Sequence, residues 1–75
     1  MNFKSKIELK ITDHRKEIDG CVTMLQFLET DFNAAVASKT LDAPVYAQKY
    51  MILKDKILYH KACVAALSDV LSEIE

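Results

Sequence analysis

The chain has 75 residues, of which 51% are hydrophobic and 28% charged, and its formal net charge is −1 at pH 7. This length allows one domain, residues 1–75, and the composition is not that of a disordered chain. Positive and negative charges are interspersed and no apolar run reaches the roughly 18 residues of a membrane span, so we expect neither a nucleic acid nor a membrane as partner.

A heptad pattern of apolar residues runs through the first half of the chain. Two series of positions, offset by three residues, are apolar throughout except at His14: Ile11, Ile18, Leu25 and Phe32 in one, and Ile7, His14, Cys21, Leu28 and Ala35 in the other. Alternating intervals of three and four residues are typical of the seam of a coiled coil. The pattern therefore predicts a helix over roughly residues 5–38.

The only proline, in the stretch SKTLDAPVYAQKY, predicts the joint between two helices. Proline lacks an N–H group and is excluded from a helix interior, but the first turn tolerates it. Asp42 precedes Pro44 by two residues and is a good N-cap, with Thr40 as a second candidate. We therefore predict a short turn followed by a helix over roughly residues 43–74, antiparallel to the first.

The second half repeats the heptad pattern, with the series Tyr50, Ile57, Val64 and Leu71 and the series Tyr46, Leu53, His60, Leu67 and Ile74. We predict an all-α fold, an antiparallel two-helix hairpin of the coiled-coil type. Pairing each series with its counterpart keeps the sum of facing residue numbers nearly constant. That register places Phe32 opposite Tyr50, Cys21 opposite His60 and His14 opposite Leu67. His14 and His60 are interpreted as polar seam residues that set the register.

The apolar residues outnumber the seam positions, which predicts a second, interacting face. Ile52, Tyr59 and Ala66 recur at intervals of seven, as a stripe facing one partner must. The predicted partner-binding residues are Met24, Phe27, Ile52, Tyr59, Ala66 and Val70. Because a large exposed apolar patch marks an interaction surface, we expect this face to complete a bundle with a second copy or with a different protein.

Catalytic and cofactor sites are not indicated. His60, Cys63 and the facing Cys21 are three possible zinc ligands, but both cysteines occupy positions that a small hydrophobic residue would fill, and a fourth ligand is missing. A two-helix hairpin also offers no concave pocket for a Cys–His nucleophile. We expect no enzymatic activity, no metal and no cofactor. The opening stretch MNFKSKIELK does not have the pattern of a signal peptide. We therefore expect Cys21 and Cys63 to be free thiols in a reducing cytoplasm.

The second helix opens with DAPVYAQ and continues with the apolar ILYHKACVAALSDVL. With a long amphipathic first helix and Tyr46 at this opening, the chain resembles the small co-chaperones of type III secretion needle subunits (the YscE, PscE and SsaE type) over roughly residues 7–74. In that family a glutamine tends to follow the tyrosine directly, whereas Ala47 intervenes here. The resemblance implies a cytoplasmic virulence-associated chaperone hairpin. It would pair with a tetratricopeptide-repeat chaperone and help keep the needle subunit monomeric before export.

A regulator of another class stays open as an alternative. A Rop-like hairpin encoded by a phage or plasmid would have the same pattern and would dimerise to bind RNA or a host protein. RNA binding requires an outward basic face, which the balanced charge disfavours. Binding of a host protein therefore remains as the alternative function, and a purely structural coiled-coil module is a third possibility.

Overall fold

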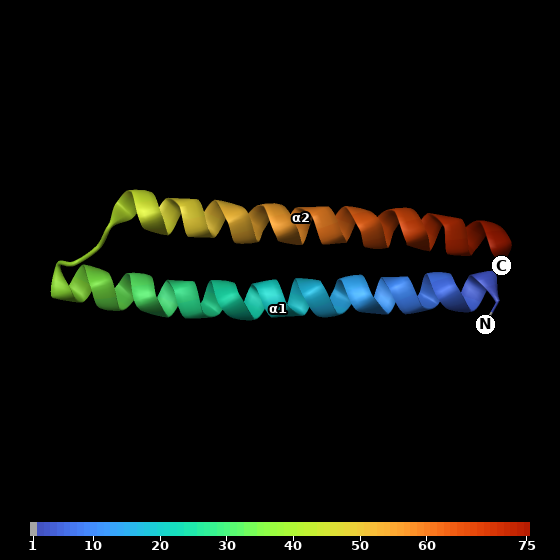
Figure 1. Cartoon of the computed structure of the whole chain (residues 1–75), viewed down its shortest axis with the longest axis horizontal. Coiled ribbons are helices and arrows are strands. Elements are labelled where there is room, and N and C mark those ends of the chain that lie inside the picture. The colour runs from blue at the N-terminus through green and yellow to red at the C-terminus, as the bar shows by residue number, and fades with distance from the viewer. Residues whose placement is uncertain (1) are drawn as a thin grey trace.

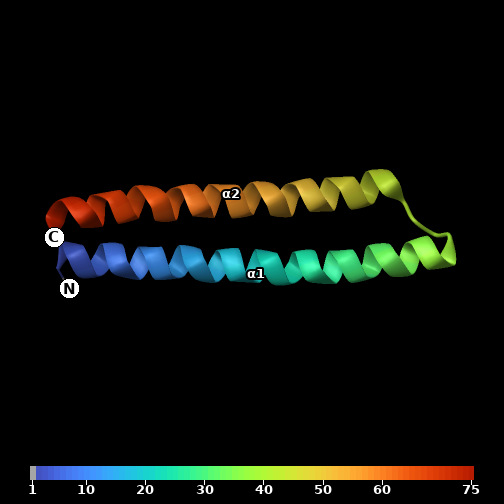
Figure 2. The ribbon, with the colours of Figure 1, turned by 180° about the vertical axis from the view of Figure 1, so that it is seen from behind.

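Two long helices make up the fold of the computed structural model, which describes residues 2–75. Helix α1 spans Phe3–Ser38 and helix α2 spans Ala43–Ile74. They lie side by side and antiparallel, with both termini at one end and the joint at the other (Figure 1), as the view from behind also shows (Figure 2). No strand occurs among the described residues. The predicted all-α antiparallel hairpin is confirmed.

Both ends of α1 are closed by local hydrogen bonds. The Asn2 side chain accepts a hydrogen bond from the N–H of Ser5 at 2.7 Å, so the helix begins two residues earlier than predicted. At the other end Lys39 adopts the left-handed conformation, with φ of 60°. The N–H of Thr40 then donates to the carbonyl oxygen of Ala35 at 2.9 Å. This Schellman arrangement satisfies a terminal carbonyl group and turns the chain out of the helix.

Helix α2 starts as the position of the proline predicts. The Asp42 carboxylate accepts a hydrogen bond from the N–H of Val45 at 3.2 Å, and Pro44 stands in the first turn, where its missing N–H is not needed. Thr40, the second candidate cap, instead shares a hydrogen bond with the Ser38 hydroxyl at 2.7 Å. The short joint therefore forces the two helices to run antiparallel.

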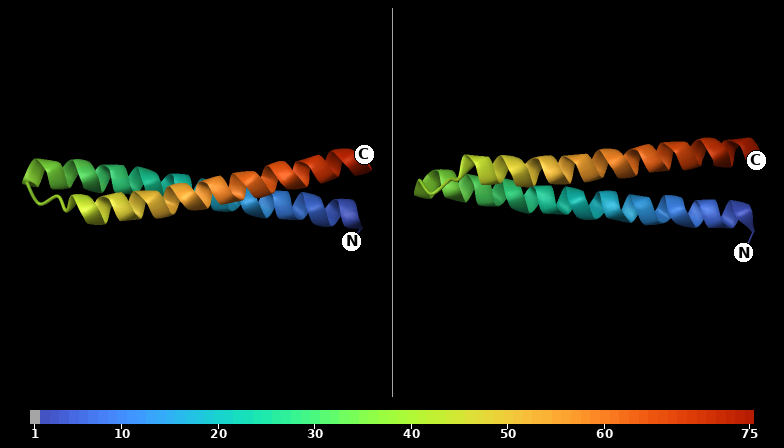
Figure 3. Two further views of the ribbon diagram at one scale, coloured as in Figure 1. Left: turned by 90° about the horizontal axis from the view of Figure 1, so that it is seen from above. Right: turned by 45° about the horizontal axis from the view of Figure 1, so that its top comes forward.

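The predicted seam lies between the helices. Every predicted seam residue is buried or half-buried except Tyr50 and Ile74. Outside the predicted series, only Cys63 and Ser68 among the described residues are also half-buried. Figure 3 shows that the two helices cross at a small angle as they run along each other. The heptad pattern thus identified the contacting stripe of each helix.

The core is thin for a chain of this length. Among the described residues, only Ile7, Ile11 and Cys21 are buried. The rod measures 55 × 16 × 14 Å and has a solvent-accessible surface of 5690 Å². The scaling law for compact monomers gives about 4,650 Å² for the same mass. The hairpin therefore exposes about 1,000 Å² more than a compact monomer of its size would.

Two contacts across the seam differ from the predicted layers, although the predicted layer mates Leu28 and Leu53 line one groove together. The ring of Phe32 lies against Tyr46, with 4.5 Å between the centroids, and not against Tyr50, which is one helical turn farther along α2. His14 contacts His60, although Leu67 was expected opposite it. Phe32 thus meets the heptad series of α2 that was not assigned to it. His14 meets its assigned series, but at a position seven residues from the expected one.

Candidate protein-interaction site

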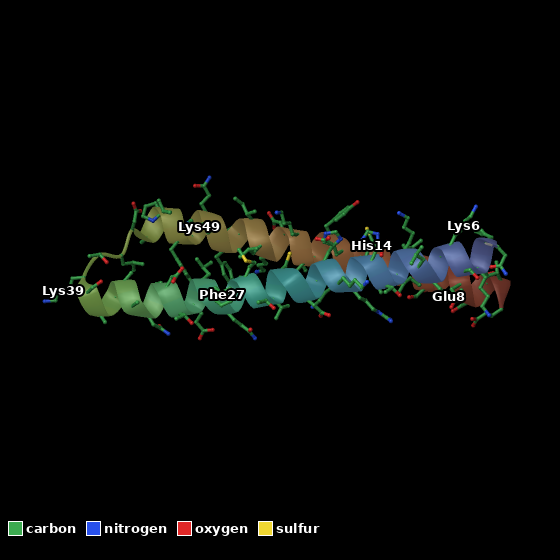
Figure 4. The ribbon with its side chains drawn as sticks, turned by 60° about the horizontal axis from the view of Figure 1, so that its bottom comes forward. Lys6, Glu8, His14, Phe27, Lys39 and Lys49 are labelled. Carbon is green, nitrogen blue, oxygen red and sulfur yellow. The ribbon has the colours of Figure 1, made fainter. Side chains whose placement is uncertain are left out.

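A groove opens along one edge of the hairpin, on the half nearer the joint. It has a volume of about 350 Å³ and combines three of the predicted partner-binding residues, Met24 and Phe27 from α1 and Ile52 from α2. Figure 4 labels Phe27 on α1 and Lys49 on α2, closer to the joint than His14 is. The structure therefore brings together side chains that are 25 or more residues apart in the sequence.

The floor and rim of this groove differ in character. Half-buried seam residues Leu28 and Leu53 line it from either helix, while Phe27 remains 62% exposed. Asp31 and Lys49 also line it and carry opposite charges. Asp31 and Lys49 do not form an ion pair. Among residues 2–75, the ion pair joins Lys4 and Glu75 instead. Both charges are therefore available to a molecule in the groove.

Tyr59 stands farther along α2 and is 63% exposed. Its ring lies edge-on to His60 and to His14, with centroid distances of 5.2 and 6.5 Å. A hydrogen bond with the Cys63 side chain raises the pKa of Tyr59, and the charge of an ionised Cys63 and slight desolvation act in the same direction. The phenol therefore stays protonated at neutral pH, with an apolar ring and a polar tip facing solvent.

Two predicted partner-binding residues lie outside the groove. Ala66 and Val70 are exposed on α2, and the structure shows no contact that links them to Met24 or Phe27. Near their level, α1 carries a polar hollow instead, lined by Lys10, Asp13, His14, Lys16 and Glu17 together with His60 of α2. On this side, the turns of α1 around residues 10–17 therefore contribute polar side chains, whereas near the joint α1 contributes Met24 and Phe27.

Replacing Gly20 by alanine is expected to stabilise the hairpin by about 1 kcal/mol, because glycine is a poor helix former. A methyl group at this position would meet no atom within 4 Å. Gly20 precedes Phe27 by seven residues and so lies on the same side of α1. Urea unfolding followed by circular dichroism measures the stability, and sedimentation equilibrium measures association. A fall in stability would contradict the open space around Gly20, whereas a gain in stability with weaker association would indicate close approach of another helix.

The described residues lack the patterns of a metal site and of a membrane-spanning helix. Across residues 2–75, no three His, Cys, Asp or Glu side chains are placed to hold a metal ion, and both cysteines are free thiols. Neither α1 nor α2, as described, is long and apolar enough to cross a membrane. Comparison with models of protein families, with curated proteins and with solved structures finds no match.

Proposed function

We propose that this chain is a non-enzymatic, protein-binding subunit that completes a helical bundle with another protein. The observation that carries the proposal is the imbalance between core and surface. Only three described side chains are buried, whereas Met24, Phe27, Ile52, Tyr59 and Val70 are each 40–63% exposed. The excess surface of about 1,000 Å² is close to the roughly 800 Å² that each partner contributes to a standard interface.

The groove suggests how a partner would bind. An apolar helix placed along the edge would cover Met24, Phe27 and Ile52 and would continue over Tyr59. Covering a side chain of this size contributes roughly 1.5–3 kcal/mol, and a few anchor residues, tyrosine among the commonest, carry most of the binding energy of an interface. Asp31 and Lys49 at the rim would add orientation rather than much affinity, because exposed ion pairs contribute roughly 0–1 kcal/mol.

Within this role we propose the process that the family resemblance implies. The hairpin stabilises a helical-repeat chaperone in the cytoplasm, and that chaperone covers the polymerising helix of a type III secretion needle subunit. Three features of the chain support this: its size, its antiparallel hairpin, and Tyr46 in the opening turns of α2, where it packs on Phe32. Masking an aggregation-prone helix requires exposed apolar surface of the kind described above.

A second copy of the chain is the other partner that the exposed area fits. Two hairpins joined through this face would form a four-helix bundle. The alternative function is therefore a small dimeric regulator of the Rop-like type, encoded by a phage or plasmid, which binds a host protein.

Co-expression tests the proposed process. The full chain is produced together with a candidate needle subunit and its tetratricopeptide-repeat chaperone, and the products are analysed by size-exclusion chromatography with light scattering. We expect the three chains to co-elute with the needle subunit monomeric, and the chaperone to be lost when this chain is omitted. Equal yields of monomeric needle subunit without this chain would refute the co-chaperone role. Recovery of the chain as a separate, stable homodimer would favour the regulator.

A further inference from the structure

We propose that His14 and His60 form a proton-sensitive latch between the two helices. Their Nδ1 atoms lie 2.8 Å apart, and the ring centroids are separated by 5.1 Å. One residue belongs to α1 and the other to α2, and both are half-buried. Among the described residues, this is the one hydrogen bond that joins a side chain of α1 to a side chain of α2.

The chemistry of the imidazole ring makes this contact dependent on protonation. A hydrogen bond between two Nδ1 atoms needs one Nδ1–H as donor and one Nδ1 lone pair as acceptor. The acceptor ring must therefore be neutral and carry its hydrogen on Nε2. The donor ring is either the neutral Nδ1–H tautomer or the imidazolium. When both rings are protonated, both Nδ1 atoms are donors and two positive charges face each other, so the latch opens.

The surroundings do not compensate a second positive charge. From α1, the polar hollow brings two lysines and two carboxylates to the pair: Lys10, Asp13, Lys16 and Glu17. These charges cancel. From α2, Tyr59 lies against both rings, and Lys56 and Cys63 stand one turn away on either side of His60 on the same helix face. Lys56 adds a further positive charge. The pair therefore has no excess of carboxylates with which a doubly charged form could be neutralised.

Opening of the latch has two consequences. The unfolded chain can take up both protons without losing a hydrogen bond, so protonation favours unfolding. Because the first proton leaves the hydrogen bond intact, the hairpin becomes less stable only at acidic pH, where the second ring also takes up a proton. Tyr59 also loses the ring surfaces against which it packs, so its orientation on the exposed face changes with the same protonation. The latch is a property of the isolated chain and does not depend on the proposed partner.

The tautomers of the two rings provide a direct test. We expect ¹⁵N spectra of the full chain labelled on histidine, recorded at pH 7.5, to show two different rings. One should carry its hydrogen on Nδ1 and the other on Nε2, and the difference should vanish as both become imidazolium toward pH 5. Two identical Nε2–H tautomers at pH 7.5 would exclude the Nδ1–Nδ1 hydrogen bond and overturn the proposal.

Thermal unfolding provides a second test. The melting temperature of the parent chain is compared at pH 7.5 and pH 5.0 with that of the double variant His14→Leu with His60→Leu, at one protein concentration and with a chelator present. We expect the parent to lose about 4–8 °C more than the variant, the shift caused by losing one such hydrogen bond in a domain of this size. The carboxylates are common to both chains, so their contribution cancels.

A single substitution tests the same proposal in case the double variant does not fold. In His60→Gln the amide can still hydrogen-bond to His14, but only one titrating ring remains. We expect its acid-dependent loss of melting temperature to be as small as that of the double leucine variant. Equal losses in the parent and in every variant would show that the two rings do not sense protons, whatever the outcome of the partner experiments.

Discussion

Replacing Phe27 or Tyr59 by aspartate is expected to weaken association of the chain, with itself or with its partner, by about 10- to 100-fold for each substitution. Both side chains are more than 60% exposed, so neither substitution removes an essential contact from the seam. Losing the burial of an aromatic ring at an interface costs roughly 1.5–3 kcal/mol, and each 1.4 kcal/mol is tenfold in affinity. Sedimentation equilibrium measures self-association, and co-purification with the proposed helical-repeat chaperone measures partner binding.

Two matched controls come from outside the predicted face. Leu58→Asp on α2 and Val22→Asp on α1 introduce the same charge at positions that are 54% and 41% exposed. Leu58 adjoins Tyr59 but points about 100° away around the helix. Circular dichroism should show all four variants to be helical. If the controls dissociate the complex as strongly as Phe27→Asp and Tyr59→Asp, the binding face lies elsewhere.

The second large effect is expected at the most enclosed part of the seam. Substitution Ile11→Ala should lower the free energy of unfolding by about 2–5 kcal/mol, through lost burial and the small cavity left behind. Ile11 is 6% exposed and, with Ile7 and Cys21, belongs to the few buried residues described. Because so few side chains are enclosed, this loss is a large fraction of the stability expected for a small domain. Urea unfolding at a fixed protein concentration measures it.

Leu25→Ala is the companion to this experiment. Leu25 is only half-buried in the hairpin, so its truncation should cost about half as much as that of Ile11, in proportion to the area removed from water. If Leu25→Ala lowers the free energy of unfolding as much as Ile11→Ala at high protein concentration but less at low concentration, another copy of the chain covers Leu25. A negligible effect of Ile11→Ala would contradict the seam itself.

The helices and their joint could be predicted from the sequence because each rests on local rules. Heptad spacing marks the stripe that must leave water, and it does so without knowledge of what lies opposite. Pro44 and Asp42 mark the start of α2, since backbone sterics and capping act within a single turn. Only the early start of α1 was missed, because Asn2 was not recognised as its cap.

The groove on the proposed interacting face could be predicted only in part. Met24, Phe27 and Ile52 were identified because they are apolar residues left over by the seam, and the structure places them around one groove. Its other lining residues, Asp31 and Lys49 among them, lie together because of which turn of α1 faces which turn of α2. The heptad register brings these two residues near each other, but the hollow between the side chains depends on their individual positions, which a repeating pattern does not give.

Sequence alone thus determined the class of the fold, the two helices and the stripe along which they meet, because hydrophobic periodicity and chain sterics act over a few residues. Only the tertiary structure decided which side chains touch across the seam. The heptad pattern marks the two stripes that meet but does not fix which ring packs on which, as the contacts of Phe32 with Tyr46 and of His14 with His60 show. The histidine pair is the clearest case. Each histidine was visible as an interruption of an apolar series, but their meeting depends on how the whole length of one helix is set against the other.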